Sequence, residues 1–159
     1  MEQKGLARWL KGIIIGVGLC GLYGYLSVVP GYGQSLVRRF PEFSYCYMPW
    51  LVVILLTAIP IYIALFFAWK IADNIGKDRS FSRENAVALK WIARLAVIDV
   101  VYFFCANFVL AFMNMNHPGI MIMSFVLDFI GIAASVCFAA LSHLVLKAAK
   151  IQEENELTI

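Results

Sequence analysis

The chain has 159 residues, of which 62% are hydrophobic and 14% are charged. Soluble domains average roughly 45–50% apolar and about 25% charged residues, and a soluble domain of this size could not bury so much apolar side chain. The formal net charge of +3 is too small to indicate direct nucleic-acid binding. The composition therefore predicts one small domain whose solvent is the lipid bilayer.

Four hydrophobic runs are long enough to cross the membrane, at residues about 9–29, 47–72, 89–113 and 119–146. About 20 residues of helix cross a hydrocarbon layer about 30 Å thick, and each run reaches that length. Lipid offers no partner to an unpaired backbone group, so the runs should be helices. The predicted fold class is an all-α, integral membrane four-helix antiparallel bundle, in which residues 1–159 form a single domain.

The first run is expected to be a retained span, because no small-residue cleavage site follows its basic start. Gly12, Gly16, Cys20 and Gly24 place a small residue at every fourth position. Gly18 and Gly21 widen this ridge, which lets another helix backbone approach closely. We expect it to pack inside the bundle, and homodimerisation is the alternative. Residues 30–46 then form an aromatic outer loop, within which SLVRRF suits a short interfacial helix.

The segment between the second and third spans, KIADNIGKDRSFSREN, carries signals for both helix ends. Gly76 suits the position after a helix C-terminus, and Ser82 suits an N-cap. Glu84 lies in the first turn of the next helix, where the helix dipole favours an acid. We expect the helices to break only between about residues 76 and 81. Phe81 then either packs on the helix ends or contacts a partner.

The distribution of basic residues predicts the orientation. If the N-terminus is cytoplasmic, 11 of the 13 Lys and Arg residues lie on that side, and only Arg38 and Arg39 lie outside. Both termini should therefore be cytoplasmic. The fourth helix should run out of the membrane to about Asn155, in a cytoplasmic tail at 147–159. Its acids Glu153, Glu154 and Glu156 are either simply solvated or part of a docking surface.

Two acids, Asp99 and Asp128, lie inside the third and fourth spans. A charged side chain at the bilayer centre costs about 2.5–3.5 kcal/mol on insertion scales. At about 1.5 Å per residue, both acids lie near the midplane. Two close carboxyl groups cannot both ionise cheaply, so at least one should hold its proton.

A polar stripe on the fourth span places these acids inside the bundle. Ser124, Asp128, Gly131, Ser135 and Ser142 share one helical face, and Asn107 marks an inward face of the third span. Two interpretations stay open. The acids are neutral, hydrogen-bonded contacts between helices, or they serve a proton or cation step or a polar ligand pocket.

No pattern predicts a metal, a cofactor or an enzyme. Cys20, Cys46, Cys105 and Cys137 lack metal-ligand spacing, and His117 and His143 have no acid beside them. Phosphate-loop and zinc-protease motifs are also missing from the sequence.

The segment GKDRSFSRENAVALKWIA resembles the signature G-x-x-F-S-x-E-N-x-x-x-L-x-x-I of the YoaS-like family, which comprises small four-span bacterial membrane proteins of unknown function. The ending AAKIQEENELTI is similar to the family's L-K-x-E-x-D-L-T-I terminus, with Ile151 and Glu156 departing from it. The gap after the first glycine is one residue longer than in the signature. The loop residues that carry the match are Gly76, Phe81, Ser82, Glu84, Asn85, Leu89 and Ile92.

The resemblance implies a bacterial inner-membrane protein, and it also implies a partner, because family members often accompany a small helix-turn-helix regulator. We expect a regulatory or scaffolding protein that holds such a partner at the membrane. An oligomeric small transporter or channel subunit using the intramembrane acids is the alternative, and a peptide- or lipid-binding immunity protein is a third reading. The expected partner-binding residues are Phe81, Ser82, Glu84, Asn85, Glu153, Glu154, Glu156 and Leu157.

Overall fold

The structure, a computed structural model, describes residues 3–156. Within that range four helical stretches are long and apolar enough to cross a membrane, and no strand occurs. They are Gln3–Arg39, Pro41–Gly76, Arg83–Phe112 and Pro118–Asn155. The predicted all-α, four-helix membrane fold is therefore confirmed.

The first helical stretch is longer than expected. α1 (Gln3–Tyr23) passes through a π-helical turn, η1 (Gly24–Val28), into α2 (Val29–Arg39) without a break. Pro30 has no amide hydrogen to donate back along the helix, and the wider π turn lies directly before it. The expected outer loop over residues 30–46 is therefore wrong for most of its length, because the SLVRRF segment continues the helix as part of α2 as far as Arg39.

The other spans follow with short connections. A 3-10 turn, η2 (Pro41–Phe43), leads into α3 (Ser44–Gly76), which is followed by α4 (Arg83–Phe112) and α5 (Pro118–Glu156). The expected second and fourth spans lie within α3 and α5. The third span ends one residue early, at Phe112 rather than 113.

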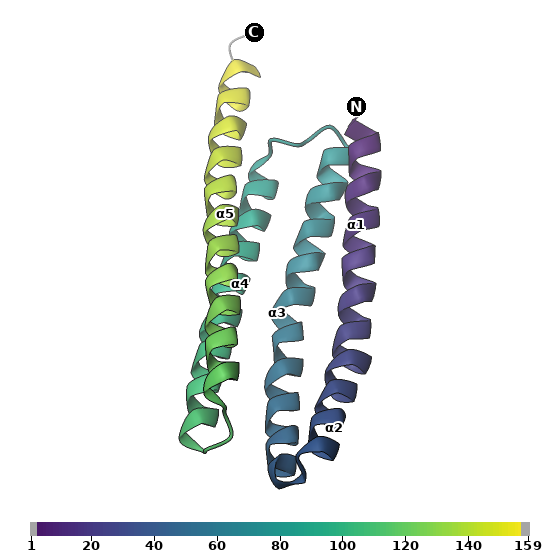
Figure 1. The fold of residues 1–159 in the computed structure, drawn as a ribbon. Coiled ribbons are helices and arrows are strands. Elements are labelled where there is room, and N and C mark those ends of the chain that lie inside the picture. The colour runs from purple at the N-terminus through teal and green to yellow at the C-terminus, as the bar shows by residue number, and fades with distance from the viewer. Residues whose placement is uncertain (1–2, 157–159) are drawn as a thin grey trace.

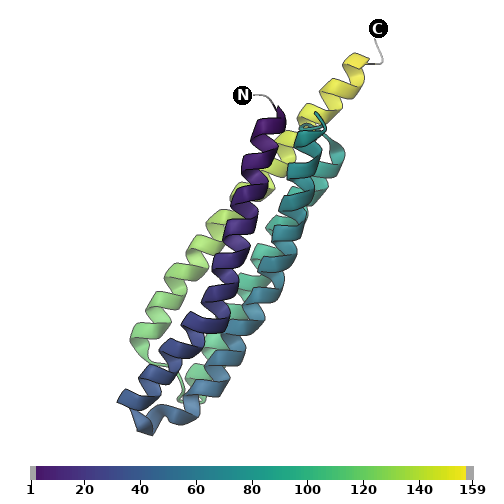
Figure 2. The same cartoon turned by 90° about the vertical axis from the view of Figure 1, so that its right-hand side faces the viewer.

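The helices run antiparallel and each packs on its neighbour in the chain (Figures 1 and 2). α1 contacts α3, α3 contacts α4, and α4 contacts α5. Among the described residues, the backbone of α1 approaches neither α4 nor α5. The bundle is therefore an open row, with α1 and α5 at its two ends.

One end of this row carries the start of α1, the turn between α3 and α4, and the end of α5 (Figure 1). We call it the basic end, because most Lys and Arg residues lie toward it, and we call the other end the opposite end. At the opposite end, the indole of Trp50 donates to the carbonyl of Met115 at 2.8 Å. The hydroxyl of Tyr45 donates to the carbonyl of Asn114 at 3.3 Å. These bonds tie the start of α3 to the turn between α4 and α5.

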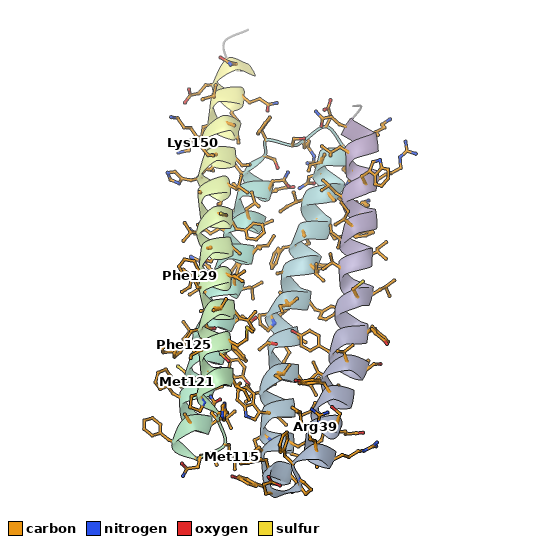
Figure 3. All side chains as sticks on the ribbon, viewed as in Figure 1. Arg39, Met115, Met121, Phe125, Phe129 and Lys150 are labelled. Carbon is orange, nitrogen blue, oxygen red and sulfur yellow. The ribbon has the colours of Figure 1, made fainter. Side chains whose placement is uncertain are left out.

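Small and polar side chains fill the contacts between helices, and large apolar side chains point outward. Ala72, Ala86 and Ala93 are buried, whereas Phe129 is 72% exposed. Figure 3 shows Phe129 directed away from the other helices. This distribution suits a bundle whose surroundings are apolar, because lipid-embedded helices gain most from close backbone packing.

The glycines divide into two groups. Gly131 of α5 lies so close to Val100 of α4 that an added Cβ would overlap its methyl group. Gly12, Gly16 and Gly24 have nothing within 4 Å of an added Cβ. The expectation that these three pack inside the bundle is therefore wrong. Gly18 and Gly21, which widen the predicted ridge, do face α3, because added Cβ atoms would lie 3.8 Å from Leu65 and 3.3 Å from the Tyr62 hydroxyl.

Candidate functional site

The turn between α3 and α4 forms a compact structure at the basic end. α3 ends at Gly76, and the backbone then reverses through Asp78, which takes a left-handed conformation with φ of 61°. The expectation that Gly76 follows the end of the helix is therefore wrong, because Gly76 is the last residue of α3. Its lack of a side chain admits α1, since an added Cβ would lie 3.2 Å from the Cβ of Ala7.

Ser82 and Asn85 hold this turn together. The Ser82 hydroxyl accepts the backbone N–H of Asn85 at 3.2 Å, which confirms the predicted N-cap. The Asn85 side chain, 2% exposed, donates to the carbonyls of Arg79 and Ser80 at 3.2 and 3.0 Å. It also accepts from Asn74 at 2.9 Å. Both predicted residues thus shape the turn from within and offer little surface to a partner.

Asn74 was missed by the sequence reasoning. It lies on α3, is 8% exposed, and also reaches Glu84 at 3.3 Å. A lone asparagine near a helix end carries no pattern that predicts a partner 11 residues away. Its contact with Asn85 fixes how α4 leaves the turn.

Two of the predicted turn residues do face outward. Phe81 is 58% exposed although it is large and apolar, and Glu84, three residues later, is also exposed. Aromatic residues are enriched in protein interfaces, so Phe81 is a candidate contact residue.

The end of α5 is joined to this turn by an ion pair. Arg83, at the start of α4, donates from Nε and Nη2 to the two carboxylate oxygens of Glu153 at 2.9 and 2.6 Å. This hydrogen bonding raises the pKa of the Arg83 guanidinium. Glu154 is exposed on the same helix. Leu157 and the side chain of Glu156 lie outside the described residues.

A groove of about 590 Å³ lies between α3 and α4 at the basic end. Phe67, Val87 and Ala88 give it an apolar part, and Lys70 lies over the ring of Phe66 at 4.7 Å. Its remaining lining is polar or charged: Lys70, Asp73, Asn74, Lys77, Arg83 and Glu84. Asp73 also pairs with Lys11 of α1, and the hydrogen bond from Lys11 lowers the pKa of the Asp73 carboxyl.

The polar stripe of α5 faces α4, as its spacing predicts. Ser135 and Ser142 donate to the carbonyls of Ala93 and Ala86 at 3.0 and 2.7 Å. Ser124 is buried too, but it donates to the carbonyl of Ile120 in its own helix. The serines thus set the register of α5 against α4 and do not hydrogen-bond to the acids.

Asp99 lies on α4 and Asp128 on α5, both within about one helical turn of the contact between Val100 and Gly131. Asp128 is 6% exposed and Asp99 is half-buried. One buried oxygen of each, Oδ1 of Asp99 and Oδ2 of Asp128, has no hydrogen-bond partner among the described residues. The expectation of hydrogen-bonded contacts through these two oxygens is therefore not met.

Asn107 lies apart from the acids. It is fully buried, donates to the carbonyl of Phe103 at 2.9 Å, and accepts from the amide of Asn116 at 3.1 Å. It therefore stabilises the turn between α4 and α5 at the opposite end.

Comparison with known proteins gives a family and no solved fold. Residues 31–159 match the family model described as "Protein of unknown function (DUF2975)". The chain is 30% identical over 149 residues to the "Uncharacterized membrane protein YoaS" of Bacillus subtilis (strain 168), covering 92% of each chain. No solved structure matches this chain. These two similarities agree with the four apolar helices and with the signature around the α3–α4 turn. The chain is therefore a membrane protein and belongs to the DUF2975 family of proteins of unknown function.

Proposed function

We propose that this protein is a scaffold of the bacterial inner membrane that binds and restrains a cytoplasmic partner, a small helix-turn-helix transcription regulator, at its basic end. The docking surface is formed by the α3–α4 turn together with the end of α5. In this proposal both termini lie in the cytoplasm.

The ion pair between Arg83 and Glu153 is the observation that carries the proposal. α5 has 39 residues, which at about 1.5 Å per residue span about 58 Å, while the hydrocarbon layer is only about 30 Å thick. The part of α5 beyond the membrane is held against the turn by the two hydrogen bonds to Arg83. Two segments 70 residues apart in sequence thus form one continuous surface outside the lipid.

The chemistry of this surface suits a protein partner. Phe81 supplies an exposed aromatic side chain, and the turn and the end of α5 carry the exposed acids Glu84, Glu153 and Glu154. DNA-binding proteins are basic, so complementary charge would speed the encounter. The groove between α3 and α4 lies beside this surface and offers an apolar part for a partner side chain.

The orientation rests on the charge asymmetry. Lys and Arg residues near membrane spans favour the cytoplasmic side, and they concentrate at the basic end. A reporter fused after the last residue should be active only inside the cell, whereas activity outside would refute the docking proposal.

Site-specific photocrosslinking in native membranes tests the partner. A photoreactive phenylalanine analogue in place of Phe81 should yield an adduct with a small DNA-binding protein. The matched control is the same analogue in place of Phe112, which is 85% exposed at the opposite end. The proposal fails if position 81 gives no adduct with a DNA-binding protein, or if position 112 gives the same one.

A further inference from the structure

Polar groups from three of the four helical stretches bond to one another around residues 53–57 of α3. The Tyr25 hydroxyl of η1 donates to Thr57 Oγ1 of α3 at 2.9 Å, since Thr57 itself donates to the carbonyl of Ile54. Tyr102 of α4 donates to the carbonyl of Val53 at 3.3 Å. Asp99 precedes Tyr102 by about one helical turn on α4, and Asp128 lies on the neighbouring helix α5.

Close packing fixes the two acids relative to each other. Gly131 follows Asp128 by one helical turn, and its missing side chain lets α5 approach α4 at Val100, the residue after Asp99. One turn further on, Ser135 bonds to the carbonyl of Ala93. α5 therefore cannot rotate to take Asp128 away from α4 without losing both contacts.

The acids lack a positive partner. The other titratable groups described around the two acids are Tyr25 and Tyr102, and neither carries a positive charge. Asp99 and Asp128 form no ion pair among the described residues. Their buried Oδ1 and Oδ2 atoms also accept no hydrogen bond within that part of the chain. Buried carboxyl oxygens without any partner are costly, and they mark ion pathways in membrane proteins.

We propose that Asp99 and Asp128 together bind one exchangeable monovalent cation, a proton or an alkali-metal ion, at the centre of the membrane. The shared cation replaces the partner that the protein does not supply. Asp128 is the buried side of the site, and the half-buried Asp99 is the side through which the cation exchanges. This site is independent of the docking surface at the basic end.

Labelling with dicyclohexylcarbodiimide tests the proposal on the full-length protein in liposomes, because this apolar reagent enters the bilayer and modifies protonated carboxyl groups. Mass spectrometry should find one adduct per chain, on Asp99 or Asp128. At pH values above the midpoint of the labelling curve, the labelling rate should fall about tenfold for each unit of pH as the proton dissociates from the carboxyl group. Slower labelling with sodium or potassium than with choline at equal pH identifies an alkali-metal ion; equal rates identify the proton alone.

The single substitutions Asp99→Asn and Asp128→Asn test whether the two carboxyl groups share the cation. Each should shift the pH midpoint of labelling at the remaining acid, whereas Glu42→Gln, in an exposed turn at the opposite end, should not. The labelling experiment on the unsubstituted protein gives a result even if neither variant folds. The proposal is overturned if neither acid is labelled at any pH, if the rate responds neither to pH nor to alkali-metal ions, or if neither substitution moves the midpoint.

Discussion

The guanidinium of Arg83 and the carboxylate of Glu153 meet side by side, through hydrogen bonds of 2.9 Å from Nε and 2.6 Å from Nη2. This two-point geometry is more specific than a single contact, because the planar guanidinium matches both carboxylate oxygens at once. Both side chains are largely exposed, at 61% and 49%. The pair therefore orients the end of α5 more than it stabilises the fold.

The substitution Glu153→Gln should loosen the end of α5 and leave the unfolding temperature nearly unchanged. A neutral amide keeps the size of the side chain but loses the charge-assisted bonds to Arg83. Spin labels at Val87 and Ile151, both exposed, should report a broader distance distribution in the variant. Concentrated salt should broaden it in the unsubstituted protein by screening the pair. Glu42→Gln is the control, and equal distributions in all three proteins would contradict the prediction.

The substitution Asn85→Ala should open the turn between α3 and α4. It removes two donated bonds to backbone carbonyls and leaves Asn74 without its buried acceptor. The expected loss of stability is about 1–3 kcal/mol. Trypsin should then cleave faster after Lys77 and Arg79, measured by mass spectrometry of timed digests. Glu42→Gln, in an exposed turn at the opposite end, should be cut at the original rate; equal rates for both variants would argue against a structural role for Asn85.

The substitution Gly131→Ala should destabilise the contact of α5 with α4 by about 1–3 kcal/mol, since the new methyl group overlaps Val100. The measurement is the unfolding midpoint in a detergent titration. Adding Val100→Ala should restore part of the loss by making room. Gly16→Ala is the matched control, because its Cβ would meet nothing within 4 Å. A larger loss at position 16 than at position 131 would show that α1 packs differently.

The ion pair of Asp73 with Lys11 predicts a pH dependence of stability. The hydrogen bond from Lys11 lowers the pKa of Asp73 in the folded protein below the value of about 3.9 for an unfolded chain. The stabilisation is therefore fully present above that value and is lost as the pH falls through the lower, folded pKa. Asp73→Asn should flatten the acid side of a plot of unfolding temperature against pH.

The matched control for this pH dependence is Asp78→Asn, because asparagine tolerates the left-handed backbone at that exposed position. It should keep the acid side of the plot unchanged. If both variants lose the same acid sensitivity, the pair with Lys11 is not its source.

Features that follow from local sequence were predicted well. The hydrophobic runs located the spans, Ser82 was identified as the N-cap of α4, and the spacing of Ser124, Asp128, Ser135 and Ser142 identified one buried face. Each of these depends on residues within a few positions of one another, so helical periodicity and capping rules are sufficient to predict them.

Features that depend on which helix lies opposite were missed. The spacing of Gly12, Gly16 and Gly24 correctly placed them on one face, but periodicity does not say which neighbour a face meets. The pairing of Asn74 with Asn85 and that of Arg83 with Glu153 likewise join different helices. The continuation of α1 into α2 was not predicted, because proline commonly ends a helix and Pro30 was read in that way. The π turn that accommodates Pro30 has no signature in the amino-acid composition.

The open row of helices has a consequence for biogenesis. Since each span packs on the span synthesised just before it, most helix contacts can form soon after a new hairpin enters the bilayer. Bonds such as that from Trp50 to Met115 form only after the turn between α4 and α5 is made, but the predominance of contacts between successive helices favours rapid assembly. The hairpins of this chain could therefore pack in the order in which they are synthesised.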